Sequence, residues 1–250
     1  MIDVRWLTAF IDMPEATFAQ GTEFWLEVTG STLSPRRGLA GQFATLLPAN
    51  GDAHLRVQRT DDGSCGVHLD LHVADPSAAQ SMAESVGART VDDTDVVIMS
   101  SPGGFTFCLV GHDGETSVAS PHDPDLPYVV DQVCIDVPAE LFDAEVEFWS
   151  ALTGWELGYS SSPEFAFLKR PDGIPLRILF QRLGADDGLT SARAHLDVAC
   201  GLANSAVAER FEQAGATVTG TWTNWVALRD PSELAFCATR RDPATGRIPG

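Results

Sequence analysis

One sequence pattern occurs twice in this chain of 250 residues, once in each half. Short matched segments follow each other in the same order in both copies. The matches are residues 24–30 with 148–154, 68–70 with 195–197, and 107–108 with 236–237. Each copy has about the length of a common domain and can bury its own core. The duplication therefore predicts two related modules in one chain.

Composition sets the predicted boundaries of these modules. Module one is expected over residues 1–114 and module two over residues 127–241. Residues 115–126 lack apolar periodicity and are rich in Pro, Ser and Asp, which is typical of a solvated linker. Residues 242–250 are expected to form a frayed tail.

The order of apolar patterns predicts an α+β fold built from paired βαβββ motifs, two in each module. Each module begins with a strand and a helix, and the Phe-Trp helix should end where Gly30 or Gly154 takes a left-handed conformation. Asp12 and Asp136 precede these helices and are predicted to cap them. Asp75 should cap the second helix of module one in the same way.

The formal charge of −19 excludes several classes of partner. A strongly acidic chain repels phosphate groups, so neither nucleic acid nor an anionic membrane is an expected partner. The sequence has no apolar run near the roughly 20 residues that a membrane helix needs. Five cysteines without a CxxC spacing indicate free thiols in a reducing compartment, and a cytoplasmic location is expected.

Taken together, the repeated segments resemble the vicinal oxygen chelate superfamily, which includes glyoxalase I, bleomycin-resistance proteins and extradiol dioxygenases. The resemblance rests on the Phe-Trp helix ending in Thr-Gly, the His-Leu-Asp strand, the Gly-Ala after the second helix, and the Phe-Cys strand. It implies two tandem glyoxalase-like modules with curved mixed sheets and helices on the outer face. Because one fold supports many reactions, it leaves the activity open.

The resemblance also implies a metal position on the concave face of each sheet, held by residues of four strands. The matched positions are Gln132, Gln181, His195 and Ala235 in module two, and Thr8, Gln58, His68 and Thr106 in module one. Ala235 has no ligand atom and Thr106 offers only a hydroxyl, whereas divalent metals favour imidazole and anionic ligands. No cofactor is therefore expected, and a divalent metal is the alternative.

The two histidines are the candidate catalytic residues. An imidazole titrates near neutral pH, so His68 and His195 could each act as a general base or orient a ligand, or simply bond to a neighbouring strand. Asp70 and Asp197 share their strand face and either assist them or are solvated at the surface. Two further residues of module two are expected to contact a ligand, Cys134 beside the first ligand position and Trp222 in the last hairpin.

The function expected from these residues is that of a metal-free small-molecule-binding protein, with antibiotic or secondary-metabolite binding or resistance as the candidate roles. The alternative is a vicinal oxygen chelate enzyme, namely a lyase, isomerase or dioxygenase. A monomer is expected, with the two modules packed as an internal pseudo-dimer. The modules can close their sheets independently or exchange halves, and independent closure is expected.

Overall fold

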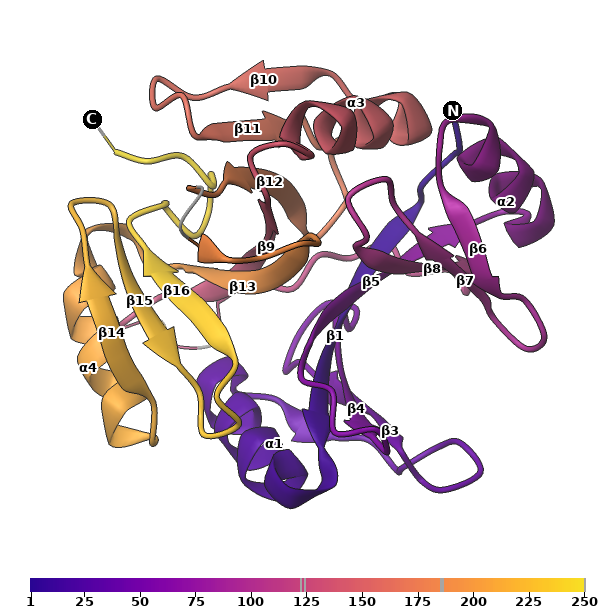
Figure 1. Cartoon of the computed structure of the whole chain (residues 1–250). Helices are drawn as coiled ribbons and strands as arrows, with labels where there is room; N and C mark the ends of the chain where they lie inside the picture. The colour runs from indigo at the N-terminus through magenta and orange to yellow at the C-terminus, as the bar shows by residue number, and fades with distance from the viewer. Residues whose placement is uncertain (122, 124, 185–186, 250) are drawn as a thin grey trace. The chain divides into compact units, whose positions relative to one another are not determined.

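The computed structural model describes residues 1–121, 123, 125–184 and 187–249 and contains two eight-stranded sheets (Figure 1). The first sheet has the order β2-β3-β4-β1-β5-β8-β7-β6. Its strands are β1 (Trp6–Pro14), β2 (Thr32–Leu33), β3 (Phe43–Leu47), β4 (Leu55–Thr60), β5 (Gly66–Val73), β6 (Arg89–Asp92), β7 (Val97–Ser100) and β8 (Thr106–Gly111). Its helices are α1 (Glu15–Thr29) and α2 (Pro76–Ser85).

The second sheet repeats this arrangement in the order β10-β11-β12-β9-β13-β16-β15-β14. Its strands are β9 (Val129–Val137), β10 (Leu157–Tyr159), β11 (Phe165–Leu168), β12 (Arg177–Arg182), β13 (Arg193–Ala199), β14 (Thr217–Thr221), β15 (Trp225–Arg229) and β16 (Ala235–Thr239). The helices are α3 (Phe142–Thr153) and α4 (Asn204–Gln213), with a short 3-10 turn η2 (Gly201–Ala203) before α4. The fold is α+β with mixed sheets, since β5–β8 and β13–β16 pair in parallel and the outer strands pair antiparallel.

Each sheet takes its strands from one module, so strands one, four, five and eight of a module are neighbours in one sheet. This strand order matches independent closure of the two sheets. The candidate site residues of each module are therefore carried by adjacent strands. No helix among the described residues is long and apolar enough to cross a membrane.

The helix ends agree with prediction only in part. Gly30 and Gly154 adopt φ values of 60° and 72°, the left-handed conformation that ends a helix. Asp75 caps α2 by accepting a hydrogen bond from the backbone of Ala78 at 3.1 Å. The prediction that Asp12 and Asp136 cap the following helices is wrong, because β1 and β9 extend through these residues and the helices begin later.

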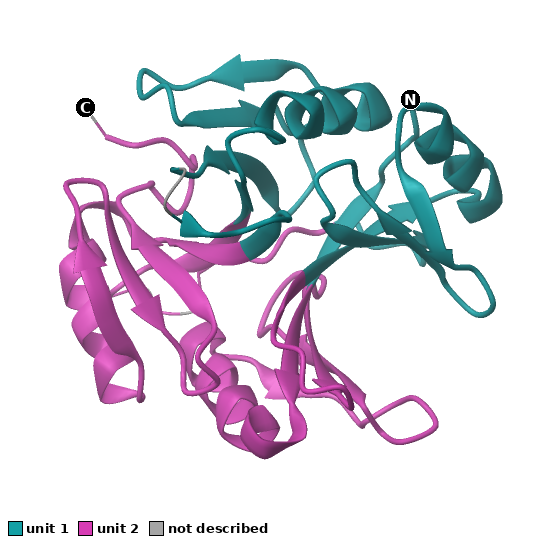
Figure 2. Ribbon diagram, viewed as in Figure 1, with its two compact units in different colours: residues 1–9, 68–116, 133–194 teal, residues 10–67, 117–132, 195–250 magenta. Residues whose placement is uncertain are grey.

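The chain also divides into two compact units that cut across the modules (Figure 2). Unit 1 consists of residues 1–9, 68–116 and 133–194, and unit 2 consists of residues 10–67, 117–132 and 195–250. Each unit combines half of module one with half of module two. The Phe-Trp helix of one module therefore shares a core with the later strands of the other.

In unit 2 this core joins α1 to β16. Trp25 packs edge-on against Phe236 at 5.3 Å between ring centroids, and its indole Nε1 donates a 2.7 Å hydrogen bond to Asp230. Asp230 also accepts backbone hydrogen bonds from Ser232 and Leu234. The buried indole is thus both packed and hydrogen-bonded.

Unit 1 contains the related core, which joins α3 to β8. Trp149 packs against Phe107 at 5.1 Å and donates a 2.8 Å hydrogen bond to Glu145 on its own helix. Glu145 accepts a second hydrogen bond from the backbone of Gly103 at 2.6 Å. A Cβ at position 103 would lie 2.7 Å from the carboxylate, so this contact requires glycine.

Candidate metal centres

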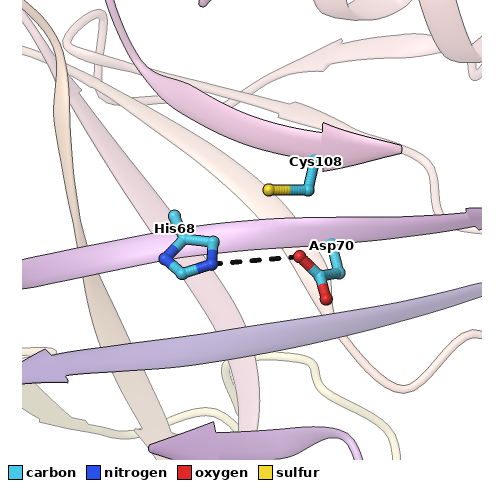
Figure 3. A group of neighbouring side chains, drawn as sticks. All are labelled: His68, Asp70 and Cys108. Atoms are coloured by element: carbon cyan, nitrogen blue, oxygen red, sulfur yellow. Dashed lines mark ion pairs between the residues drawn. The ribbon is translucent and has the colours of Figure 1, made fainter. Parts of the chain in front are cut away.

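The first candidate centre, called the first cluster, consists of His68, Asp70 and Cys108 in module one. Strand alternation places His68 and Asp70 on one face of β5, and Cys108 of β8 pairs in register with Asp70. Figure 3 shows the three side chains together, with His68 Nε2 3.9 Å from Asp70 Oδ1. All three ligand atoms lie within 4.8 Å of one another. Asp70 and Cys108 are buried, and His68 is mostly so.

Module two repeats the same three residues as His195, Asp197 and Cys237, called the second cluster. Cys237 pairs in register with Asp197 across β13 and β16. His195 Nε2 lies 3.5 Å from Asp197 Oδ1 and 3.7 Å from Cys237 Sγ. The duplication has therefore preserved a His/Asp/Cys group at one position of both sheets.

The second cluster differs from the first in having a buried arginine beside it. Arg241 lies 3.5 Å from Asp197 Oδ2 and forms a buried ion pair with Asp131. Gln132 donates a 2.5 Å hydrogen bond to the same Asp197 oxygen. Burial raises the pKa of Asp197, but hydrogen bonding and the charges of His195 and Arg241 outweigh it, so the pKa lies below its ordinary value. Asp197 is therefore an anion that already has a cationic partner.

The donor atoms of both clusters suit a divalent transition metal. Imidazole, carboxylate and thiolate are all established ligands of zinc, and imidazole and carboxylate also bind iron and manganese. Three protein ligands leave a coordination position open, as in catalytic zinc sites. The ligand atoms in each cluster are also close enough to share one ion after small side-chain movements.

Two of the predicted ligand positions are wrong by two residues along the strand. Thr106 and Ala235 are exposed, whereas Cys108 and Cys237, two residues further along each strand, join the clusters. Thr8 bonds to His72 at 2.9 Å. The alternative that Asp70 and Asp197 are solvated is wrong, because both are buried.

The remaining predicted residues have varied environments. Cys134 is buried on β9, while Gln58 on β4 and Gln181 on β12 are half-buried. Trp222 is 51% exposed and stacks on Trp225, with ring centroids 5.4 Å apart. The functional roles assigned to these residues stay predictions.

The sequence analysis did not assign every residue with a ligand atom. The unassigned residues include Cys108, Cys237, His72, His112 and Glu115. For His72 a signal was present, since the alternation of His68, Asp70 and His72 puts all three on one face of β5. The match of residues 107–108 with 236–237 was the signal for the two cysteines, and it was not used to assign them as ligands.

The glyoxalase-like domain family matches residues 8–110 and 132–239, and the chain belongs to this family. A search of curated protein sequences gives no match.

Solved structures with the same fold include enzymes. A Mn(II)-bound glyoxalase from Novosphingobium aromaticivorans is 15% identical with a TM-score of 0.63, over 99% of this chain and 87% of that one. A catechol 2,3-dioxygenase is 14% identical with a TM-score of 0.62, over 95% and 88%. A 4-hydroxymandelate synthase mutant from Streptomyces coelicolor is 13% identical with a TM-score of 0.59, over 94% and 91%. At these identities the likeness establishes the fold.

Two expectations from the sequence are corrected by these findings. The expectation of a metal-free binding protein is contradicted, because the matched structures are named as a Mn(II)-bound glyoxalase, a dioxygenase and a synthase. The expected absence of a cofactor is also wrong, since it rested on Thr106 and Ala235 rather than on the cysteines that complete the clusters. The expectation of a small-molecule partner agrees with the glyoxalase-like fold.

Proposed function

We propose that this protein is a vicinal oxygen chelate enzyme, a lyase, isomerase or dioxygenase, that acts on a small molecule with a divalent metal. The observation that carries the proposal is the His/Asp/Cys group, which occurs at one matched position in both modules. Matched structures named as a Mn(II)-bound glyoxalase and dioxygenases support it.

The first cluster is the proposed catalytic centre. Cys237 and His195 belong to a cluster whose carboxylate is paired with Arg241. Two unit charges 4 Å apart interact by about 4 kcal/mol at an effective dielectric constant of about 20. The repulsion between Arg241 and a divalent ion at that distance would be about twice as large. In module one the position matched to Arg241 is His112, an imidazole that faces the carboxylate of Glu115 in place of a permanently charged guanidinium. Module one therefore suits a dication better than module two.

The three residues of the first cluster are the proposed metal ligands. His68, Asp70 and Cys108 would hold the ion, which when bound would polarise a substrate oxygen as a Lewis acid. Burial of Asp70 and Cys108 restricts water around the reacting group and strengthens electrostatic interactions there.

Cobalt(II) titration of the full chain tests the metal assignment. A thiolate-to-cobalt charge-transfer band should appear, should be lost in Cys108→Ala, and should persist in the matched variant Cys237→Ala. His68→Ala and His195→Ala form a second matched pair with the same expectation. A band that follows Cys237 would move the centre to module two, and no band in the wild type would overturn the metal proposal.

Oxygen uptake separates the reaction classes. The iron(II)-loaded protein is mixed with catechol in an oxygen electrode, with His68→Ala as the inactive control. Uptake that depends on His68 supports a dioxygenase. Metal binding without uptake supports a lyase or isomerase, and uptake that is unchanged in His68→Ala contradicts the proposed centre.

We also propose the module boundaries 1–114 and 127–241, with a linker at 115–126 and a tail at 242–250. The backbone of Asp52 donates a hydrogen bond to Ser117 at 2.6 Å, so the linker is anchored near its start. The proposed form in solution is a monomer. A net charge of −19 supports a small-molecule partner rather than nucleic acid.

A further inference from the structure

A third group of ligand residues, called the third cluster, lies in module one outside the proposed catalytic centre. It consists of His72 on β5, His112 just after β8, and Glu115 at the beginning of the linker. The side chains of His72, His112 and Glu115 are 1%, 14% and 17% exposed. Two imidazoles and one carboxylate are thus gathered in a largely buried place.

Both imidazoles direct the same ring nitrogen at one carboxylate. His72 Nδ1 lies 3.7 Å from Glu115 Oε1, and His112 Nδ1 lies 3.3 Å from Glu115 Oε2. Zinc–nitrogen and zinc–oxygen bonds are about 2.0–2.2 Å long, so ligand atoms in a tetrahedral site are roughly 3.3–3.5 Å apart. The observed separations are close to those of ligands that surround one ion.

Thr8 contacts one of these imidazoles. Its hydroxyl Oγ1 lies 2.9 Å from His72 Nε2, on the ring nitrogen opposite to the one that faces Glu115. When Nε2 carries the proton and donates to Thr8, Nδ1 has its lone pair directed at Glu115. Histidine ligands of metals are commonly fixed by such a hydrogen bond from the other nitrogen.

Module two lacks this group. The strand that reads His-Leu-Asp-Leu-His in module one reads His-Leu-Asp-Val-Ala in module two, so Ala199 stands at the position of His72. Arg241 likewise stands at the position of His112 and pairs with Asp131 and Asp197. The two modules thus differ at this level of the sheet, a buried ion pair in one and a His/His/Glu group in the other.

We propose that His72, His112 and Glu115 form a second divalent-metal site in module one, separate from the first cluster. Two histidines and one carboxylate are a ligand set of zinc enzymes and of iron(II) oxygenases. Glu115 follows β8, so a bound ion would also tie the beginning of the linker to β5. Zinc is the expected ion, and binding should raise the melting temperature of the full chain.

The test uses the absence of sulfur from this site. In the full-length variant Cys108→Ala/Cys237→Ala, cobalt(II) should still give ligand-field bands without a thiolate charge-transfer band, and zinc should bind by calorimetry. Adding His112→Ala or Glu115→Gln should weaken zinc binding at least tenfold. Asp113→Asn is the matched control for Glu115→Gln, because it removes one negative charge from the same segment. It should leave the affinity for zinc unchanged.

If the double cysteine variant does not fold, the wild type gives the answer. His112→Ala should lower bound zinc by one ion per chain while the thiolate-to-cobalt band of the first cluster persists. Zinc content that is unchanged in both His112→Ala and Glu115→Gln would overturn the proposal and leave His72, His112 and Glu115 as an ion-paired group. Loss of the thiolate band alone would count against the catalytic centre and not against this site.

Discussion

The side-chain amide of Gln132 donates a hydrogen bond to Asp197 Oδ2 over 2.5 Å, and both residues are buried. Gln132 therefore supports the carboxylate of the second cluster. Gln132→Leu removes one donor from a buried anion and should lower the free energy of unfolding by about 1–3 kcal/mol. Urea denaturation measures the change.

Gln181→Leu is the control for this prediction, because Gln181 is a half-buried glutamine on β12 of the same sheet. Its effect should stay below about 0.5 kcal/mol. Equal losses in the two variants would mean that the hydrogen bond to Asp197 contributes nothing specific. Cobalt binding by the first cluster should be unaffected by either change.

Arg241 is the cation between two buried carboxylates, those of Asp131 and Asp197. Burial lowers the pKa of Arg241, but the two carboxylates raise it by a larger amount. The net pKa is above its ordinary value, so the group is charged. Arg241→Met should destabilise the protein by about 3–5 kcal/mol, since removing one partner leaves buried charge uncompensated. The double variant Asp131→Asn/Arg241→Met should recover part of this loss in thermal unfolding. A single variant as stable as the wild type would contradict the buried network.

The sequence predicted the fold because its signals are local and duplicated. Gly30 and Gly154 mark helix ends that need a left-handed residue, and the structure has them there. The ligand position was harder, because Ala235 and Cys237 lie two residues apart and share one strand face. Alternation cannot choose between them. The choice depends on the register of β13 against β16, which pairs Asp197 with Cys237 through contacts distant in sequence.

The network around Arg241 shows a second limit. Arg241 directly precedes the predicted tail, and its side chain is buried against Asp131, which is 110 residues away in sequence. Helix caps show a third limit. Asp12 precedes a proline, as a cap would, but the sheet extends β1 through both residues and the helix begins at Glu15. Tertiary pairing overrides the local signal in both cases.

Asp230 gives a prediction for pH. Burial raises its pKa, although hydrogen bonds from Trp25, Leu234 and Ser232 oppose this. A carboxyl with a raised folded-state pKa contributes stability that is fully present below its unfolded pKa of about 4 and is lost as the pH rises through the folded value. The stability of the wild type relative to Asp230→Asn should therefore decrease as the pH is raised from about 4. Urea unfolding of both proteins between pH 3.5 and 7 measures this, and a difference that grows with pH would contradict the raised pKa.

The final prediction concerns the oligomeric state. Trp25 of module one packs against Phe236 of module two within unit 2, and Trp149 of module two packs against Phe107 of module one within unit 1. Such helix-to-strand contacts between repeats are made inside one chain, so a second chain is not needed to bury them. Light scattering over a range of concentrations should give the mass of one chain, 26.8 kDa. A mass near two chains that persists on dilution would show that the repeats use another copy as well.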